Sequence, residues 1–159
     1  GSLGMIAILA LVAGLWLPYA PPAAPDATEV AAASPLRESF GEQIELAGYR
    51  WDAVQSGDKG RRLILYWRAA RPIDADLRTS LRLLNERGEV IWEWKRSPGA
   101  GRFSTDRWPT DRLWADIYHV PILRLSEAKG VEIGVRPFPE ETWLARENNP
   151  SLLVLSKPE

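Results

Sequence analysis

The hydrophobic pattern divides the chain into two unlike parts, of which the first is one long apolar run. Residues 3–20, LGMIAILALVAGLWLPYA, carry no charge. As a helix that rises about 1.5 Å per residue, this run would be about 27 Å long, close to the hydrocarbon thickness of a bilayer. Trp16 and Tyr19 near its end suit the aromatic belt of a membrane interface. We therefore predict one transmembrane helix over residues 1–20, which binds the protein to a membrane.

Two other interpretations of this run stay open. A secretory signal usually begins with Lys or Arg, and none precedes the run, but cleavage after Ala33 would still fit such a signal. The run could also be a buried helix of a soluble fold, although no polar face interrupts it.

The segment 21–39 that follows is rich in Pro and Ala and offers little to bury, which predicts an extended linker of polyproline type. Its first charges are Asp26 and Glu29 rather than Lys or Arg. By the positive-inside rule this favours an extracytoplasmic location for residues 21–159.

From residue 40 onward the pattern changes to short runs that are rich in β-branched and aromatic residues and are separated by Gly, Pro, Asn and Asp. A short helical turn is expected within 123–129. Seven strands are predicted, near 43–52, 61–69, 78–85, 89–95, 112–120, 130–137 and 151–156. This spacing, without a long amphipathic helix, predicts an all-β domain over 40–159, an antiparallel two-sheet sandwich of jelly-roll or immunoglobulin-like type.

Three local patterns refine this prediction. The run 63–67 is apolar on both parities, which is typical of a central strand covered on both faces and assigns Trp67 to the core. Gly88 can adopt the positive φ that a tight hairpin needs. Trp92 and Trp94 share one parity, so both indoles are predicted to face inward.

Composition limits the function further. With 20 basic and 21 acidic side chains the net charge is −1, so no overall field attracts nucleic acid, and we expect no such partner. The chain has no cysteine, which excludes disulfides, thiolate nucleophiles and Cys-ligated metals.

The polar residues do not form a recognisable catalytic pattern. His119 is the only imidazole, and it is predicted to be an ordinary strand-end residue. Asp106, Asp111 and Asp116 recur every five residues, which fits turns and strand ends better than a metal site. Two further sets are interpreted as solvated charges: the acids Asp74, Asp76, Glu140 and Glu141, and the basic run Lys59-Gly-Arg-Arg62. We expect no catalytic residue, no metal and no cofactor.

Tryptophan is unusually frequent, with eight residues in the chain. An indole can fill a core or stack on a sugar ring. Trp51 is assigned to the core with Trp67, and Trp108, between a charged turn and Pro109, is predicted to close one end of the sandwich. Trp114 and Trp143 are the candidates for exposure and therefore for ligand binding.

Several of these motifs occur in an order that resembles a known family. They are Leu65–Ala69, Pro72, the Gly88 hairpin, Pro98…Gly101-Arg-Phe…Thr105…Trp108, Asp116-Ile-Tyr118 and Gly134–Pro137. Together they resemble the β-sandwich module behind the last membrane helix of large bacterial mannosyltransferase-related polytopic proteins of the glycosyltransferase-like kind. The chain departs from that family at Arg82, Lys95, Ser104 and Thr110-Asp111, where the family often has His, Asp, Pro and Pro-Gly.

The resemblance implies a non-catalytic extracytoplasmic accessory domain that shapes substrate access to a membrane glycosyltransferase-like protein. Trp67, Trp108, Asp116 and Tyr118 would then belong to its structural motif. The alternative is a membrane-tethered module that binds a glycan or a lipid-linked sugar, which would need a row of exposed aromatic side chains. Exposure of Trp114 and Trp143 distinguishes the two.

Overall fold

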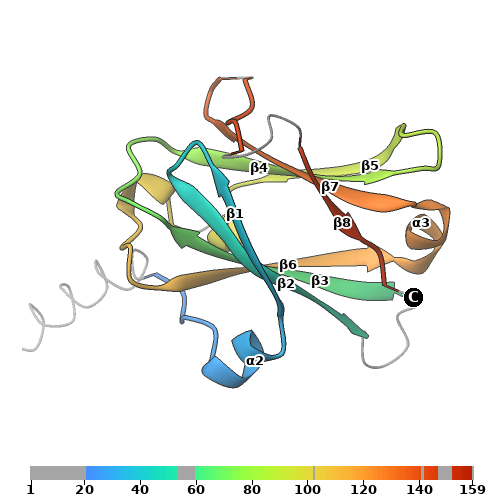
Figure 1. The fold of residues 1–159 in the computed structure, drawn as a ribbon, viewed down its shortest axis with the longest axis horizontal. Coiled ribbons are helices and arrows are strands. Elements are labelled where there is room, and N and C mark those ends of the chain that lie inside the picture. The colour runs from blue at the N-terminus through green and yellow to red at the C-terminus, as the bar shows by residue number, and fades with distance from the viewer. Residues whose placement is uncertain (1–20, 54–59, 102, 141, 147–151, 159) are drawn as a thin grey trace, which may run out of the picture.

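The computed structural model describes residues 21–53, 60–101, 103–140, 142–146 and 152–158. Two four-stranded antiparallel sheets lie face to face (Figure 1). Sheet A has the order β1 (Ser34–Phe40), β2 (Ile44–Ala53), β3 (Gly60–Ala69) and β6 (Leu113–Pro121). Sheet B has the order β5 (Val90–Arg96), β4 (Leu77–Leu84), β7 (Gly130–Pro137) and β8 (Leu153–Ser156). The prediction of an all-β, two-sheet antiparallel domain is confirmed.

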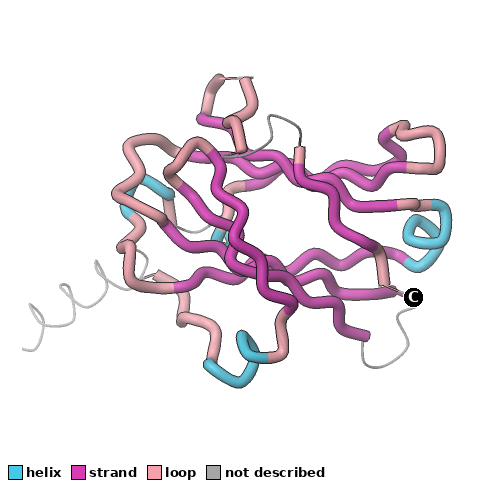
Figure 2. Tube along the Cα trace, in the orientation of Figure 1, coloured by secondary structure: helices cyan, strands magenta, loops and turns pink. Residues whose placement is uncertain are grey.

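Short helical segments occupy the connections (Figure 2). They are α2 (Ala27–Ala31), the 3-10 turns η2 (Gly99–Gly101) and η3 (Thr105–Arg107), and α3 (Ile122–Glu127), which confirms the helical turn expected there. The predicted hairpin is also present, because Gly88 has a φ of 77° and its N–H donates to the Asn85 carbonyl at 3.0 Å.

The core lies between the sheets and follows the alternation of the strands. Leu63, Leu65 and Trp67 of β3 point inward, and Trp67 is completely buried. On the other face of β3, Ile64 and Tyr66 are buried as well. The run 63–67 is therefore covered on both faces, as its apolar parities predicted.

The linker predicted over 21–39 is wrong for most of its length. The side chain of Asp26 caps α2 by accepting from Glu29 N at 2.8 Å, and β1 begins at Ser34 and pairs with β2. The strand was not predicted because Pro35 argued against a strand, but a proline is tolerated on an edge strand such as β1. The domain therefore begins before residue 40, and we call residues 21–33 the connector.

The predicted transmembrane helix over 1–20 falls outside the described residues. Within the part of the chain that the structure describes, no helix is long and apolar enough to cross a membrane.

Candidate functional site

The first candidate for ligand binding, Trp114, is in the core. It is 1% exposed, and its ring stacks on Trp108 with centroids 4.4 Å apart and on Phe103 at 5.7 Å. The prediction that Trp114 is exposed is therefore wrong. The alternation along β6 could have predicted this burial, because Trp114 shares its parity with the buried Tyr118.

The charged loop between β5 and β6 is a structural crossover. Trp108 is buried, as predicted, and its indole N–H donates to the Phe103 carbonyl at 3.0 Å. The hydroxyl of Thr105 is also buried, accepts from Leu77 N at 2.7 Å and donates to the Ala75 carbonyl at 2.7 Å. These contacts fix the loop to the start of β4.

Asp116 and Tyr118, the other two motif residues, are fully buried on the inner face of β6. Burial raises the pKa of the Tyr118 phenol, and the nearby Asp116 carboxylate raises it further. The Arg96 guanidinium lies over the Tyr118 ring, 4.0 Å from its centroid. A phenol that keeps its proton inside the core is a structural group rather than an acid or base at neutral pH.

Both indoles of β5 were predicted to face inward. This is confirmed for Trp94, whereas Trp92 is only partly covered. Trp94 packs against the core and meets Tyr118 edge-on at 5.9 Å. Trp92 has the same parity but is 38% exposed, and its strand β5 is at the edge of sheet B. Arg124 of α3 lies 5.1 Å from its ring centroid.

The other polar residues singled out in the sequence do not converge. His119 and Asp106 are exposed, whereas Asp116 is buried. Asp76 is ion-paired with Arg78 at 2.8 Å, and Arg62 with Asp52 at 3.4 Å. Lys59 and Glu141 lie outside the described residues. Among the residues with described positions, no three His, Asp or Glu side chains gather where they could hold a metal ion.

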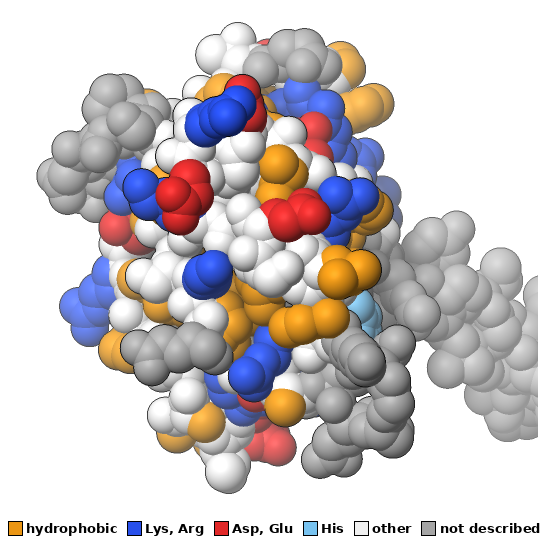
Figure 3. Space-filling model, turned by 90° about the vertical axis from the view of Figure 1, so that its right-hand side faces the viewer, with side chains coloured by type: hydrophobic (Ala, Val, Ile, Leu, Met, Phe, Trp, Pro, Cys, Tyr) orange, Lys and Arg blue, Asp and Glu red, His pale blue; other side chains and the backbone are white. Residues whose placement is uncertain are grey.

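One end of the sandwich, with α3 and the β4–β5 hairpin, exposes apolar side chains among charged ones (Figure 3). Leu123 of α3 is 75% exposed, and Ile122 beside it is also exposed. A depression of about 400 Å³ lies between residues 84–88 of the hairpin and residues 154–156 of β8. Its lining combines the apolar Leu84, Val154 and Leu155 with polar and charged residues of the hairpin and with Lys129.

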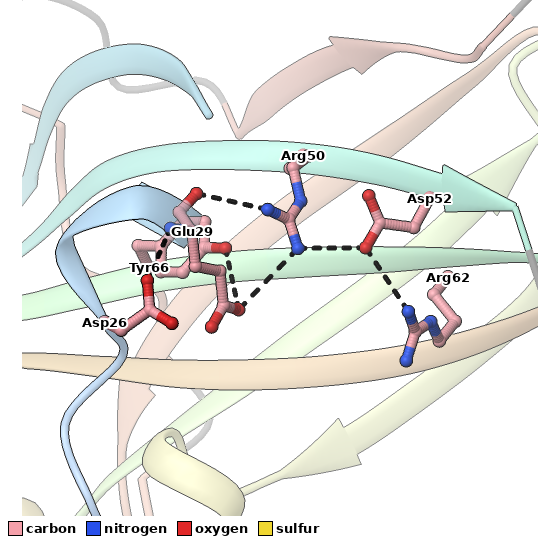
Figure 4. A network of polar contacts seen from close by, with 6 residues as sticks. All are labelled: Asp26, Glu29, Arg50, Asp52, Arg62 and Tyr66. Carbon is pink, nitrogen blue, oxygen red and sulfur yellow. Dashed lines mark hydrogen bonds and ion pairs between the residues drawn. The ribbon is translucent and has the colours of Figure 1, made fainter. Parts of the chain in front are cut away.

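On the outer face of sheet A, a polar network fastens the connector to the strands (Figure 4). The Tyr66 hydroxyl donates to Glu29 at 3.0 Å, and Arg50 donates to the Glu29 backbone carbonyl at 3.2 Å. Arg50 also binds Asp52 at 2.9 Å, which in turn accepts from Arg62. Burial raises the pKa of Tyr66, and its hydrogen bond to Glu29 raises it further. The network holds the connector in place, and its members bind one another.

On the outer face of sheet B, Trp143 packs against β7 at Gly134. A Cβ placed on Gly134 would come within 2.9 Å of the Trp143 ring, so the indole rests directly on the glycine backbone. The guanidinium carbons of Arg82 and Arg136 lie over the ring, 5.5 and 5.6 Å from its centroid. Trp143 is half-buried, so its predicted exposure is only partial.

Two arginines stand opposite each other beside this ring. Arg78 of β4 and Arg136 of β7 are direct cross-strand partners on the outer face of sheet B. Arg78 also lies 4.9 Å from the ring centroid of Phe138, which is 59% exposed. We call Arg78, Arg82, Arg136 and Trp143 the arginine face. Sequence reasoning found Trp143 but missed the arginines, because only the register of β4 with β7 brings them together.

Comparison with known proteins gives no relative: no family model, no curated protein and no solved structure matches this chain.

Proposed function

We propose that this chain is a non-catalytic accessory domain of a membrane glycosyltransferase-like protein, anchored through residues 3–20 with the sandwich on the extracytoplasmic side. The observation that carries the proposal is the docked connector. Arg112, which directly precedes β6, donates to the Pro22 carbonyl at 2.6 Å, and Glu29 is held by Tyr66 and Arg50.

The docked connector supports this role because it would fix the sandwich relative to the anchor. An extended residue spans at most about 3.6 Å, so a sandwich contact at Pro22 lies within about 7 Å of residue 20. A domain on a free linker would instead sample many orientations. A fixed orientation suits a domain that shapes access to a membrane-embedded site.

The burial of the motif residues also fits the resemblance. Trp67, Trp108, Asp116 and Tyr118 are all buried and form part of the scaffold. The alternative is a tethered module with a row of exposed aromatic residues, and Trp114 cannot belong to such a row because it is buried. Of the two candidates for such a row, only Trp143 is left.

The orientation is tested with fluorescence energy transfer from the full chain to labelled lipid headgroups. Because the chain has no cysteine, the substitutions Thr110→Cys and Glu86→Cys each add one labelling site. Thr110 lies in the loop before β6, two residues from Arg112, and Glu86 lies in the β4–β5 hairpin. That loop and that hairpin are at opposite ends of the sandwich (Figure 1). We expect the full chain to float with liposomes and to transfer more efficiently from position 110 than from position 86.

Two variants complete this test. In the double variant Glu29→Ala/Arg50→Ala the connector should detach from sheet A. The transfer efficiencies from positions 110 and 86 should then become more similar. Arg68→Gln, which changes an ion pair elsewhere on sheet A, serves as the matched control. Failure to float with liposomes, or equal transfer from both positions in the unsubstituted background, would contradict the anchored, oriented domain.

The non-catalytic part of the proposal has its own assay. The full chain in liposomes is incubated with sugar nucleotides, lipid-phosphate sugars and oligosaccharides, and we expect no released or transferred sugar. Turnover that disappears in His119→Ala or Asp116→Asn, with the fold intact, would replace the accessory role with an enzyme.

A further inference from the structure

Three of the four edge strands of the described sheets carry features that hinder pairing with another chain. On β1, Pro35 lacks an N–H, and the pairing with β2 is irregular between Pro35 and Glu38. On β6, the Ile117 carbonyl already accepts from the Arg96 side chain at 3.1 Å. The strand β8 has only four residues. Prolines, irregular pairing and short length are the usual means by which edge strands avoid association.

The fourth edge strand, β5, has none of these features. It is seven residues long, contains no proline, and among the described strands it pairs only with β4. Its pairing with β4 is regular from Trp92 to Arg96. Val90 and Trp92 are 47% and 38% exposed. Since half of the N–H and C=O groups of an edge strand point away from its neighbour, β5 offers a regular edge to which another strand can be added.

The charges of β5 complement those of a second β5 in one register. Glu93 and Lys95 lie on the outer face of the sheet, on the opposite parity to Trp94. In an antiparallel pair of identical strands within one continuous sheet, the two-fold axis passes through one residue. An axis at Glu93 places two carboxylates opposite each other, and an axis at Lys95 places two ammonium groups opposite each other. An axis at Trp94 instead places each Glu93 opposite a Lys95, which stabilises the pair.

The regular part of β5 favours the same register. The stretch from Trp92 to Arg96 has Trp94 at its centre, so an axis at Trp94 pairs all of it. An axis at Trp92 would use the irregular end of the strand, and an axis at Arg96 would use residues beyond it.

Both charged side chains have room for a second contact. The Glu93 carboxylate accepts from the Ser80 hydroxyl and lies 3.5 Å from the Lys95 ammonium of its own chain. A carboxylate can accept further hydrogen bonds, and the Lys95 side chain is 56% exposed. A lysine on an edge strand usually discourages association. In the register centred on Trp94, Lys95 faces an acid and favours association instead.

We propose that β5 pairs with β5 of a second copy of this chain, antiparallel and around a two-fold axis at Trp94. The two copies of sheet B then form one continuous sheet. The axis is perpendicular to the sheet, so both connectors, on the outer faces of the two copies of sheet A, lie on the same face of the dimer. This arrangement allows two anchors to enter one membrane, but the pairing does not depend on the anchor or on the accessory role, and its test is separate from theirs.

The register is tested by disulfide cross-linking of the full chain in a polyoxyethylene detergent, with micelles in excess over protein. The chain has no cysteine, so Glu93→Cys and Lys95→Cys each supply a single thiol. Directly opposite residues are about 4.5–5.5 Å apart, which a disulfide can bridge, whereas residues offset by two positions are about 8 Å apart. We expect a mixture of the two variants to cross-link at least about fivefold more than either variant alone. A mixture of Lys95→Cys with Arg68→Cys, on the outer face of sheet A, measures random collisions.

The charge pairing is tested by exchange of charges between two chains. In Lys95→Glu both pairs at the interface join two acids, and in Glu93→Lys both join two bases. We expect each variant alone to dimerise at least about tenfold more weakly than the unsubstituted chain in sedimentation experiments. An equimolar mixture of the two variants pairs acid with base at both positions and should recover dimers. The indole N–H signals of the tryptophans in nuclear magnetic resonance show whether each variant is folded.

Several results would overturn the proposal. The unsubstituted chain could remain monomeric at every concentration, or Glu93→Cys alone could cross-link as well as the mixture, which would indicate another register. The proposal also fails if the dimer is unaffected by Lys95→Glu, because the interface would then lie elsewhere, or if the mixture of charge variants does not recover dimers.

Discussion

The outer faces of the two sheets are built from similar residues but arrange their charges differently. On sheet A, Arg62 and Arg68 face Asp52 and Glu45 across the ladder, and the connector covers part of the surface. On sheet B, Arg78 faces Arg136. Opposite charges on neighbouring strands support the fold, whereas like charges oppose it.

This difference shows where charge pairs between neighbouring strands support the fold. The charged residues of the sheet A network bind one another and the connector, so each one contributes to holding the chain together. On sheet B, Arg78 and Arg136 bring two positive charges side by side, next to the rings of Phe138 and Trp143.

The largest effect is expected from removing the connector. Deletion of residues 1–36 removes α2, its contacts with Tyr66 and Arg50, and the Ser34–Tyr49 and Pro35–Gly48 pairs of β1. We expect the free energy of unfolding to fall by about 2–4 kcal/mol. Deletion of residues 1–20 should leave it within about 0.5 kcal/mol of the full chain. Urea unfolding measures both, and equal stability of the two truncations would mean that the connector is only a linker.

The sequence predicted more of the fold than of the site. The seven strands and the hairpin at Gly88 were predictable, because alternation and turn residues are local signals. The strand β1 was not predictable, because Pro35 and the preceding alanines are not typical of a strand. Its pairing with β2 stabilises it.

The candidate site was harder to predict, because it depends on which residues become neighbours in space. The exposure of an indole is set by its parity and by its neighbours in space, so Trp114 and Trp143 could not be distinguished by their frequency or by nearby charges. Arg78 and Arg136 are 58 residues apart, and only the register of β4 with β7 makes them neighbours.

The second largest effect is expected at the glycine under Trp143. In Gly134→Ala the new methyl would lie 2.8 Å from the indole and 2.7 Å from Leu152, so Trp143 must move away from β7. We expect a loss of about 1–3 kcal/mol in the free energy of unfolding and a shifted Trp143 indole signal. Ser80→Ala, directly opposite on β4, removes only a hydrogen bond to Glu93 and serves as the control. An unshifted Trp143 signal would show that the ring does not rest on Gly134.

A smaller effect is expected from the phenol in the sheet A network. Tyr66→Phe removes the hydrogen bond to Glu29 and should lower the free energy of unfolding by about 0.5–1.5 kcal/mol at pH 7. The pKa of Tyr66 is raised in the folded state, chiefly by burial, while an unfolded tyrosine titrates near pH 10. Above that pH the unfolded chain loses the proton that the folded chain keeps, so stability falls as pH rises.

The free energies of unfolding of Tyr66→Phe and of the unsubstituted chain should therefore converge as the pH rises above about 10. Urea unfolding at pH 7, 9 and 10.5 measures this convergence. A difference that stays constant across these three pH values would show that the raised pKa of Tyr66 has no part in the stability of the network.

The smallest effect is the direct interaction between the facing arginines. A double-mutant cycle with Arg78→Gln and Arg136→Gln isolates their coupling from the contacts that each makes with Asp76, Phe138 or Trp143. We expect a repulsive coupling of about 0.2–1 kcal/mol that shrinks as salt is added. The cycle of Glu45→Gln and Arg68→Gln, whose side chains are 2.6 Å apart on sheet A, should give an attractive coupling. Attraction in both cycles would show that the two faces do not differ in the coupling between their cross-strand charges.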